Sequence, residues 1–262
     1  MVKENAEVRC NDRLTSQDYW DGVHSTQPRL RLPSALVVST RNLHRDLRKH
    51  IVAGTHVLEI GFAPGKHLAY VAKTLGARVA GIDYSENGIT FAKRLFSALE
   101  IDADLRCEDL FATTFAARTF DFVYSVGVVE HFDDPRDIVR RHVDLLRPGG
   151  TALILIPDYS GIYGLLQRYF DPESLDIHNL RIMTPEAMAA LAPRDLVKDV
   201  HAFRTGRINS WQISIENKWP RTLAKAVHLL FNAVALMQPF DISKLCPTIA
   251  LKMSRIHDDS RL

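Results

Sequence analysis

The chain has few cysteines and no long uninterrupted hydrophobic run. Three of its 262 residues are cysteines, Cys10, Cys107 and Cys246, and they form no CxxC pair. This pattern argues against a disulfide framework and against a zinc site, and it fits a reducing compartment. The most apolar stretch, residues 223–240, is interrupted by Lys225 and other polar residues, so it is too short and too polar to cross a bilayer. We therefore predict a cytoplasmic protein.

The chain also lacks an excess of charge, an internal repeat and a low-complexity tract. Lys and Arg number 33 and Asp and Glu number 31, which gives a formal net charge of +2. That balance provides no basic field, so we predict no nucleic-acid partner. The first ten residues are polar and charged and predict no signal peptide. With 46% hydrophobic residues the chain can bury a core, which excludes global disorder.

Short apolar runs alternate with helix-like segments from about residue 54 onward. Because these runs lack the polar alternation of half-exposed strands, they predict a parallel sheet covered on both faces. Right-handed crossovers then predict a doubly wound α/β fold. The expected strands are 56–61, 78–83, 103–109, 120–127 and 151–157, and the expected helices between them are 66–75, from the N-cap Ser85 to about 99, and 135–146.

The rhythm is different before residue 54 and after residue 157. Residues 1–53 are charge-rich and are predicted to form a helical lid segment, followed by one α/β domain over 54–262. We expect insertions at about 158–183, without regular structure, and at about 216–243. Between and after them we expect a short capped helix at 184–191 and strands at 196–203, 208–215 and 248–253.

Small and acidic residues stand where the predicted strands end. The first run continues as Glu59-Ile-Gly61-Phe-Ala63-Pro-Gly65, and the second ends at Asp83, 22 residues after Gly61. In an open parallel sheet, ligands bind beyond the carboxyl ends of the strands. Glycine there lets a ligand touch the backbone, and an acid can accept both hydroxyls of a ribose. The third run ends at Asp109 and the fourth continues from Ser125 to a glycine, so four strand ends predict one nucleoside-sized ligand.

The turn after the first run does not match the common phosphate-binding motifs. A P-loop has four residues between its glycines, whereas Gly61 and Gly65 have three between them. A dinucleotide fingerprint needs glycines at 63 and 66, where Ala63 and Lys66 stand. Glu59 would repel a pyrophosphate but attract an ammonium or sulfonium. These features oppose the alternative of a nicotinamide-dependent oxidoreductase.

Five ordered segments carry a resemblance to a known family. They are VLEIGFAPGKHLAYVA (57–72), GIDYS (81–85), CEDL (107–110), FDFVYSVGVVEHFDDP (120–135) and LLRPGGTALILIP (145–157). Together they resemble the class I S-adenosylmethionine-dependent methyltransferases, and the last two look like the type 11, small-molecule branch. The resemblance implies a Rossmann-like, mostly parallel seven-stranded sheet and S-adenosylmethionine as the cofactor. Ala63 departs from the family, which usually has a glycine there.

The resemblance also implies roles for individual residues. Glu59 and Gly61 would hold the methionine end of the cofactor, Asp83 the ribose, and Tyr84 would lie against the adenine. Glu108 could replace its neighbour Asp109 if the strand register differs by one residue. The other expected cofactor residues are Asp109 at the adenine amine, Ser125 beside the methionine, Ala63, Gly65, Ser85 and Leu110 in the same motifs, and Tyr19 of the Tyr19-Trp20 pair, which would close over the cofactor.

Methyl transfer from a sulfonium needs an aligned acceptor and a place for one proton. Histidine is the usual base near neutral pH, and His131 and His178 are the candidates. The alternatives are a structural hydrogen-bonding role for His131 and an ordinary cap position for His178. Glu130-His131 with nearby acids invites a metal site, but the ligands are too few, so we predict no metal.

The expected acceptor is a small molecule: a sugar, a phenol or quinone-like compound, or a lipid-linked intermediate, with methylation on oxygen expected. The apolar helix at 219–240 is interpreted as packed on the sheet or at a homodimer interface. An interfacial helix that meets a membrane surface is the alternative that we favour less. A catalytically silent methyltransferase-like binding subunit is the alternative from another functional class.

Overall fold

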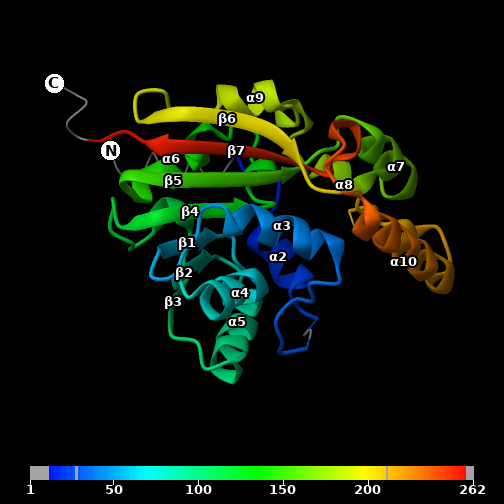
Figure 1. The fold of residues 1–262 in the computed structure, drawn as a ribbon, viewed down its shortest axis with the longest axis horizontal. Helices are drawn as coiled ribbons and strands as arrows, with labels where there is room; N and C mark the ends of the chain where they lie inside the picture. The colour runs from blue at the N-terminus through cyan, green and yellow to red at the C-terminus, as the bar shows by residue number, and fades with distance from the viewer. Residues whose placement is uncertain (1–11, 27–28, 211, 258–262) are drawn as a thin grey trace.

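A single seven-stranded sheet forms the centre of the computed structural model, which describes residues 12–26, 29–210 and 212–257 (Figure 1). The strand order is β3-β2-β1-β4-β5-β7-β6, and β7 runs in the opposite direction to the other six strands. The predicted doubly wound, mostly parallel α/β fold is confirmed. The strands are β1 His56–Ile60, β2 Arg78–Asp83, β3 Ala103–Cys107, β4 Phe120–Val126, β5 Leu146–Pro157, β6 Val197–Thr205 and β7 Thr248–Arg255.

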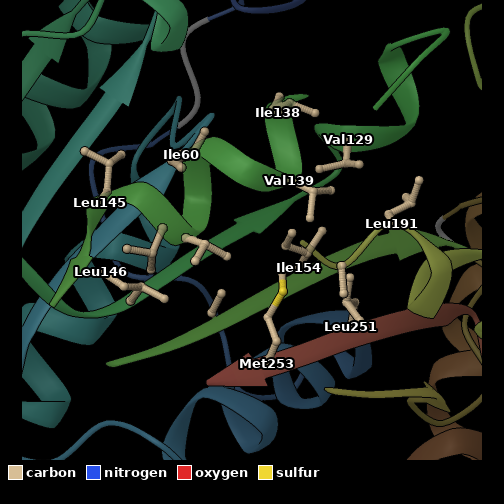
Figure 2. Close-up of a cluster of buried hydrophobic side chains, with 14 of the residues drawn as sticks. Ile60, Val129, Ile138, Val139, Leu145, Leu146, Ile154, Leu191, Leu251 and Met253 are labelled. Carbon is tan, nitrogen blue, oxygen red and sulfur yellow. The ribbon is translucent and has the colours of Figure 1, made fainter. Parts of the chain in front are cut away.

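Helices cover both faces of the sheet, and alternate strand residues point to opposite faces. Leu58 and Ile60 of β1 pack with one group of buried residues, and Val57 packs with the other. The first group lies under α6 Arg136–Leu145 and α9 Pro185–Ala190. Figure 2 shows it, with side chains of β5 and β7 beside those of α6. The second group lies under α3 Val38–Arg48, α4 Lys66–Leu75 and α5 Glu86–Ala98.

Helix ends follow the predicted cap residues closely. Ser85 precedes α5 and accepts a hydrogen bond from the Gly88 amide, and Thr184 precedes α9 and accepts one from the Ala187 amide. Each side chain satisfies a backbone donor that has no partner within the helix. These caps position the β2–α5 turn, which is where the second strand meets the predicted site.

Two expectations after residue 157 are wrong. The described residues of 208–215 form no strand, because their polar groups bond side chains of the inserted segments instead: Asn209 donates its amide to the Tyr163 hydroxyl, and Ser210 bonds His228. The segment 158–183, expected to lack regular structure, contains helices. They are α7 Ile162–Phe170 and α8 Glu173–Asp176, followed by the 3-10 turn η3 Leu180–Ile182.

The second inserted segment forms a helix that extends away from the sheet. α10 Arg221–Met237 lies below α7 at the right of Figure 1 and follows the 3-10 turn η4 Ile215–Asn217. It buries Ala224, His228 and Ala235, while Leu230 and other large apolar side chains are exposed. In the part of the chain that is described, no helix is long and apolar enough to cross a membrane.

The remaining elements surround the carboxyl ends of the parallel strands. α2 Gln17–Val23 comes from the N-terminal segment, and its Asp21 side chain accepts a hydrogen bond from the Ser85 hydroxyl at the end of β2. The short turns η1 Leu110–Ala112 and η2 Val129–His131 follow β3 and β4, and η5 Ser243–Leu245 precedes β7. Segments far apart in the sequence therefore meet at this edge of the sheet.

Candidate active site

A pocket opens where β1, β2 and β4 end, and we call it the first pocket. Its walls include five of the predicted cofactor residues: Gly61, Ala63, Asp83, Tyr84 and Leu110. Apolar side chains form most of the remaining wall, so a ligand there would lose contact with water.

Asp83 is the buried acid of the first pocket. Its two carboxylate oxygens accept hydrogen bonds from the backbone amides of Ala63, at 3.0 Å, and Ser85, at 2.9 Å. Burial raises the pKa of Asp83, and the two amide bonds oppose that shift. Each carboxylate oxygen can accept a further hydrogen bond. Asp83 therefore joins the turns after β1 and β2 and still offers acceptors to a ligand hydroxyl.

Gly61 has a backbone conformation and a location that favour glycine. Its φ is +68°, and a Cβ placed there would lie 2.4 Å from Cγ2 of Val128, another wall residue of the pocket. A side chain would therefore be both strained and too close. At Ala63, the methyl group lies over Gly88, where a Cβ would approach it to 2.5 Å. The extra methyl at position 63 is thus accommodated by a glycine in the facing helix.

Glu59 and Ser125 are buried but do not line the first pocket. The Tyr124 hydroxyl donates to Oε2 of Glu59 at 2.7 Å, and burial raises the pKa of Glu59 to about 8. The hydroxyl of Ser125 lies 2.9 Å from Nε2 of His142, whose Nδ1 donates to a carbonyl of α6. Ser125 is therefore part of the contact between β4 and α6. Glu59 belongs to the strand that supports the pocket.

The other predicted cofactor residues lie beside the pocket. Gly65 and Ser85 are the N-cap residues of α4 and α5. Asp109 forms a 2.6 Å ion pair with Arg13, whereas Glu108 lines the first pocket. The alternative that Glu108 faces the ligand is thus the one that the pocket geometry favours.

The N-terminal segment contributes wall residues, of which only Trp20 belongs to a motif that the sequence singled out. Arg13 lies over the ring of Tyr84, with its guanidinium carbon 4.9 Å from the ring centre. Trp20 lines the pocket and bonds Thr15, whereas Tyr19 is 42% exposed and is not a wall residue. His24 is a further wall residue. Helical spacing alone could have suggested that only one ring of the Tyr19-Trp20 pair faces inward, but not which one.

A second pocket adjoins the first, and both are lined by Trp20, Val126, Gly127 and His131. It reaches to Tyr159 and other residues of the inserted segments. Its polar wall residues include Asn42 and Asp46 of α3, and Thr205, Asn209 and Gln212 from a segment more than 150 residues later. None of these could be found from spacing, since tertiary packing alone brings them together.

The two predicted catalytic histidines are neighbours at this second pocket. The ring centres of His131 and His178 are 4.7 Å apart, and both residues are wall residues. Burial lowers the pKa of His131 to about 4, with the nearby His178 adding to the shift, and burial also lowers the pKa of His178. Both imidazoles are thus neutral at pH 7, and each has a nitrogen that can accept a proton or a metal.

Part of the chain matches a known family. Residues 58–154 match the sequence model of a family described as "Methyltransferase domain". The Ubiquinone biosynthesis O-methyltransferase of Coxiella burnetii is 27% identical over 135 residues, which are 52% of this chain and 55% of that relative. The matched segment thus spans about half the length of that curated relative.

Solved structures with a similar fold extend over more of the chain. The phosphoethanolamine N-methyltransferase 2 of Haemonchus contortus, solved with S-adenosylhomocysteine, has a TM-score of 0.55 and 17% identity over 80% of this chain and 51% of that one. The cyclase SpnF has a TM-score of 0.57 and 15% identity over 84% of this chain and 82% of that one. At such identities the likeness concerns the fold. Residues 58–154 are therefore similar to the methyltransferase-domain family, and the chain has the class I S-adenosylmethionine-dependent methyltransferase fold.

Proposed function

We propose that this protein transfers a methyl group from S-adenosylmethionine to an oxygen atom of a small molecule. The observation that carries the proposal is the pair of adjoining pockets. The first has a buried acid, Asp83, at the end of β2, and the second has two neutral histidines, His131 and His178, where it meets the first. The family match of residues 58–154 supports the same reaction class.

The first pocket suits S-adenosylmethionine in shape and chemistry. Asp83 has oxygens for the ribose hydroxyls, Gly61 exposes backbone, and Tyr84 with Leu110 offers an apolar wall for a base. Glu108 is the acid within reach of the adenine side. The cofactor supplies a methyl group on a sulfonium, which is transferred by in-line displacement. Glu59, buried behind the pocket, supplies negative charge once a cationic ligand favours its ionised form.

The second pocket would hold the acceptor, and its walls would exclude water from the transfer. A neutral imidazole beside the acceptor hydroxyl can take the proton that the oxygen loses. His178 comes from an inserted segment and His131 from the turn after β4, so acceptor recognition and proton transfer would share one location. We propose that the N-terminal segment acts as a lid, because Trp20 is a wall residue of both pockets.

The first test is calorimetric titration of the purified protein with S-adenosylmethionine and S-adenosylhomocysteine, with a nicotinamide dinucleotide as the control. We expect micromolar or tighter affinity for the first two ligands and none for the third. Tight binding of the nicotinamide dinucleotide alone would favour the oxidoreductase alternative. Binding of both sulfur compounds without turnover across an acceptor screen would favour a silent binding subunit, or another reaction on the same fold, and would contradict methyl transfer.

Replacing His178 by alanine should lower turnover roughly 100-fold, in the range that general acid–base catalysis contributes. Affinity for S-adenosylhomocysteine should stay within about threefold, because His178 lines the second pocket and not the first. Steady-state rates with an acceptor, together with calorimetry, measure both effects. The exposed His201 on β6, replaced in the same way, is the matched control. Full activity of the His178→Ala enzyme would exclude its role in the reaction.

A further inference from the structure

Four hydrogen-bond acceptors on the walls of the second pocket have no partner within the described part of the chain. Glu130 is 1% exposed, and its Oε2 forms no hydrogen bond there. Oε1 of Gln212 is buried and unpaired in the same way, while Nε2 of that amide donates to the Pro247 carbonyl at 2.7 Å. The other two acceptors are ring nitrogens of His131 and His178. All four residues line this pocket.

The two imidazoles present a lone pair to the pocket because of the bonds that their other nitrogens form. Nδ1 of His131 lies 2.8 Å from the Ile177 carbonyl, and Nδ1 of His178 lies 2.5 Å from the Ser174 carbonyl. A carbonyl only accepts, so in the neutral rings both Nδ1 atoms carry the hydrogen and both Nε2 atoms keep a lone pair. Each ring can therefore accept one hydrogen bond from a ligand.

Side-chain N–H donors on the same walls are used within the protein. The Asn42 amide donates to the Arg207 carbonyl at 3.0 Å, and the Trp20 indole donates to the Thr15 hydroxyl at 3.0 Å. No lysine or arginine is among the described wall residues of this pocket. A phosphate or carboxylate, which binds best to cationic donors, would find none here. The pocket is therefore suited to an uncharged ligand that donates hydrogen bonds.

Glu130 differs from Asp46, the other acid on these walls. Asp46 accepts hydrogen bonds from the Lys49 ammonium at 2.8 Å and from the Thr205 hydroxyl at 2.7 Å, so its charge is compensated within the protein. Oε2 of Glu130 has no such partner, and burial raises the pKa of Glu130 to about 8. The carboxyl group is therefore mainly neutral at pH 7, and in that form it both donates and accepts hydrogen bonds. A ligand hydroxyl matches it, because a hydroxyl does both as well.

The acceptors of Glu130, His131 and His178 lie close enough together to bind neighbouring hydroxyls. One carboxylate oxygen and one nitrogen of each ring all lie within 4.8 Å of one another. Asn179 maintains this spacing, since its backbone amide donates to the Glu130 carbonyl at 2.7 Å and its side-chain amide to the Phe132 carbonyl at 3.0 Å. A hydrogen bond from a hydroxyl is about 2.8 Å long. Two hydroxyls on adjacent carbons can therefore lie between two of these acceptors.

We propose that the second pocket takes an uncharged sugar ring as the methyl acceptor, and that Glu130 selects it by accepting a hydrogen bond from the hydroxyl next to the one that is methylated. This assignment rests on the proposed function. The reacting oxygen forms a bond to the methyl carbon, the carbon–sulfur bond breaks with its electron pair going to sulfur, and the hydroxyl proton goes to Nε2 of His178. Gln212 and His131 accept hydrogen bonds from further hydroxyls of the same ring.

Phenols and amines match these walls less well than a sugar does. A phenol with one hydroxyl would leave the oxygens of Glu130 and Gln212 buried and unpaired, which lowers its affinity. An ammonium group only donates, and a carboxyl group that is neutral at pH 7 offers it no compensating charge. A ring with several hydroxyls pairs with all four acceptors at once.

Glu130→Met separates a role in acceptor binding from a role in folding. Methionine is apolar and of similar length, and a buried carboxyl group without a partner costs stability. We therefore expect this variant to unfold at the same temperature as the unchanged protein or at a higher one. Its affinity for S-adenosylhomocysteine should also be unchanged, because Glu130 does not line the first pocket. A residue with only a structural role would instead lower the melting temperature when replaced.

The test measures the formation of S-adenosylhomocysteine from S-adenosylmethionine with a panel of stereoisomeric methyl hexopyranosides. We expect turnover with at least one of them, and analysis of the product identifies the methylated hydroxyl. Analogues of that glycoside that each lack one neighbouring hydroxyl are then compared. With the unchanged protein, one analogue should lose about 10–100-fold in kcat/KM, the effect of one hydrogen bond to a charged group.

The Glu130→Met enzyme should lose a similar factor with the intact glycoside, and removal of the neighbouring hydroxyl should then have no further effect. Such non-additivity reports a direct contact, which a structural role would not produce. Glu130→Gln keeps an acceptor oxygen and should lose less activity than Glu130→Met. The matched control is Glu173→Gln, which changes an exposed acid of α8 and should behave as the unchanged protein does.

Phenol, ethanolamine and glucose 6-phosphate serve as competing acceptors in the same assay. Turnover with any of them and with no glycoside would overturn the assignment, and so would full activity of Glu130→Met or additive losses. If S-adenosylhomocysteine binds in calorimetry but no glycoside is methylated, the sugar assignment fails while the cofactor part of the proposed function stands. If no sulfur ligand binds, the proposed function fails and the assignment fails with it.

Discussion

The Asp83→Ala protein is expected to bind S-adenosylhomocysteine at least about 100-fold more weakly than the unchanged protein. The buried carboxylate would form two charge-assisted hydrogen bonds with the ribose, and each contributes about 1.5–3 kcal/mol. Their loss together corresponds to a factor of about 100 or more in affinity. Asp83 also accepts the amides of Ala63 and Ser85, so its removal loosens the turns that shape the first pocket. Calorimetry measures the affinity.

Thermal unfolding of the same variant separates the loss of ligand contacts from unfolding. Two buried amides lose their acceptor, and we expect a decrease of about 1–3 kcal/mol in the free energy of unfolding, which leaves a folded protein. The matched control is Asp104→Ala, which removes an acid that is exposed and forms an ion pair with Arg106. Its affinity for the ligand should be unchanged. Affinity within threefold of normal in Asp83→Ala would contradict the assignment of this acid to the ribose.

The unliganded protein should be most stable near pH 6.5 and should lose about 2 kcal/mol by pH 5. Burial lowers the pKa of His142 to about 4, and burial together with His67 lowers that of His44 to about 3. Unfolded histidine titrates near 6.5, so between pH 6.5 and 4 the unfolded chain binds protons that the folded chain does not. Stability is therefore present above pH 6.5 and is lost as the pH falls.

Glu59 acts in the opposite direction, because burial raises its pKa to about 8. Its contribution is present below pH 4.5 and is lost as the pH rises through 8. Burial also lowers the pKa of His67 and His131 to about 4 and raises the pKa of Glu130 to about 8. Between pH 5 and 6.5 these four histidines oppose two glutamates, which leaves a net loss of stability on acidification. In a chain of this size, the loss of about 2 kcal/mol corresponds to a decrease of about 4–8 °C in the melting temperature, which thermal unfolding measures.

The His142→Gln variant tests the origin of this pH dependence. It removes one of the four histidines, while the amide can still reach the Ser125 hydroxyl that His142 contacts. The melting temperature should then decrease only about half as much between pH 6.5 and 5. His201→Gln removes an exposed histidine and should keep the profile of the unchanged protein. An unaltered slope in His142→Gln would show that other groups determine the acid sensitivity.

The sequence predicted the regular half of the fold well. β2 and α4 begin and end at the expected residues, and Ser85 caps α5 as expected. Local effects dominate here: strands buried on both faces must be apolar throughout, and helix starts need a side-chain acceptor. The prediction was weakest at 162–170 and 208–215, where α7 and an irregular segment pack against each other and against α10. Their conformation depends on partners far away in the chain.

The residues of the candidate site also divide into those that the sequence predicted and those that depend on tertiary packing. Gly61, Ala63, Asp83, Tyr84 and Leu110 line one pocket, as strand-end positions in a parallel sheet should. The motifs did not show which of two adjacent residues faces the pocket. Glu108 lines the pocket while Asp109 pairs with Arg13, and Trp20 lines it while Tyr19 is exposed. Such choices depend on a side-chain direction that a shift of one residue reverses.

The amino-acid sequence by itself placed small residues in the turn after the first strand and an acid, Asp83, at the end of the second. Both placements follow from local requirements of the backbone. Tertiary structure alone decided what lies opposite them. It brought His178 to Glu130 and His131 through the hydrogen bonds of Asn179, and it placed Trp20 between the pockets. The physical reason is that these contacts join segments that are distant along the chain, and no periodicity in either segment encodes the other.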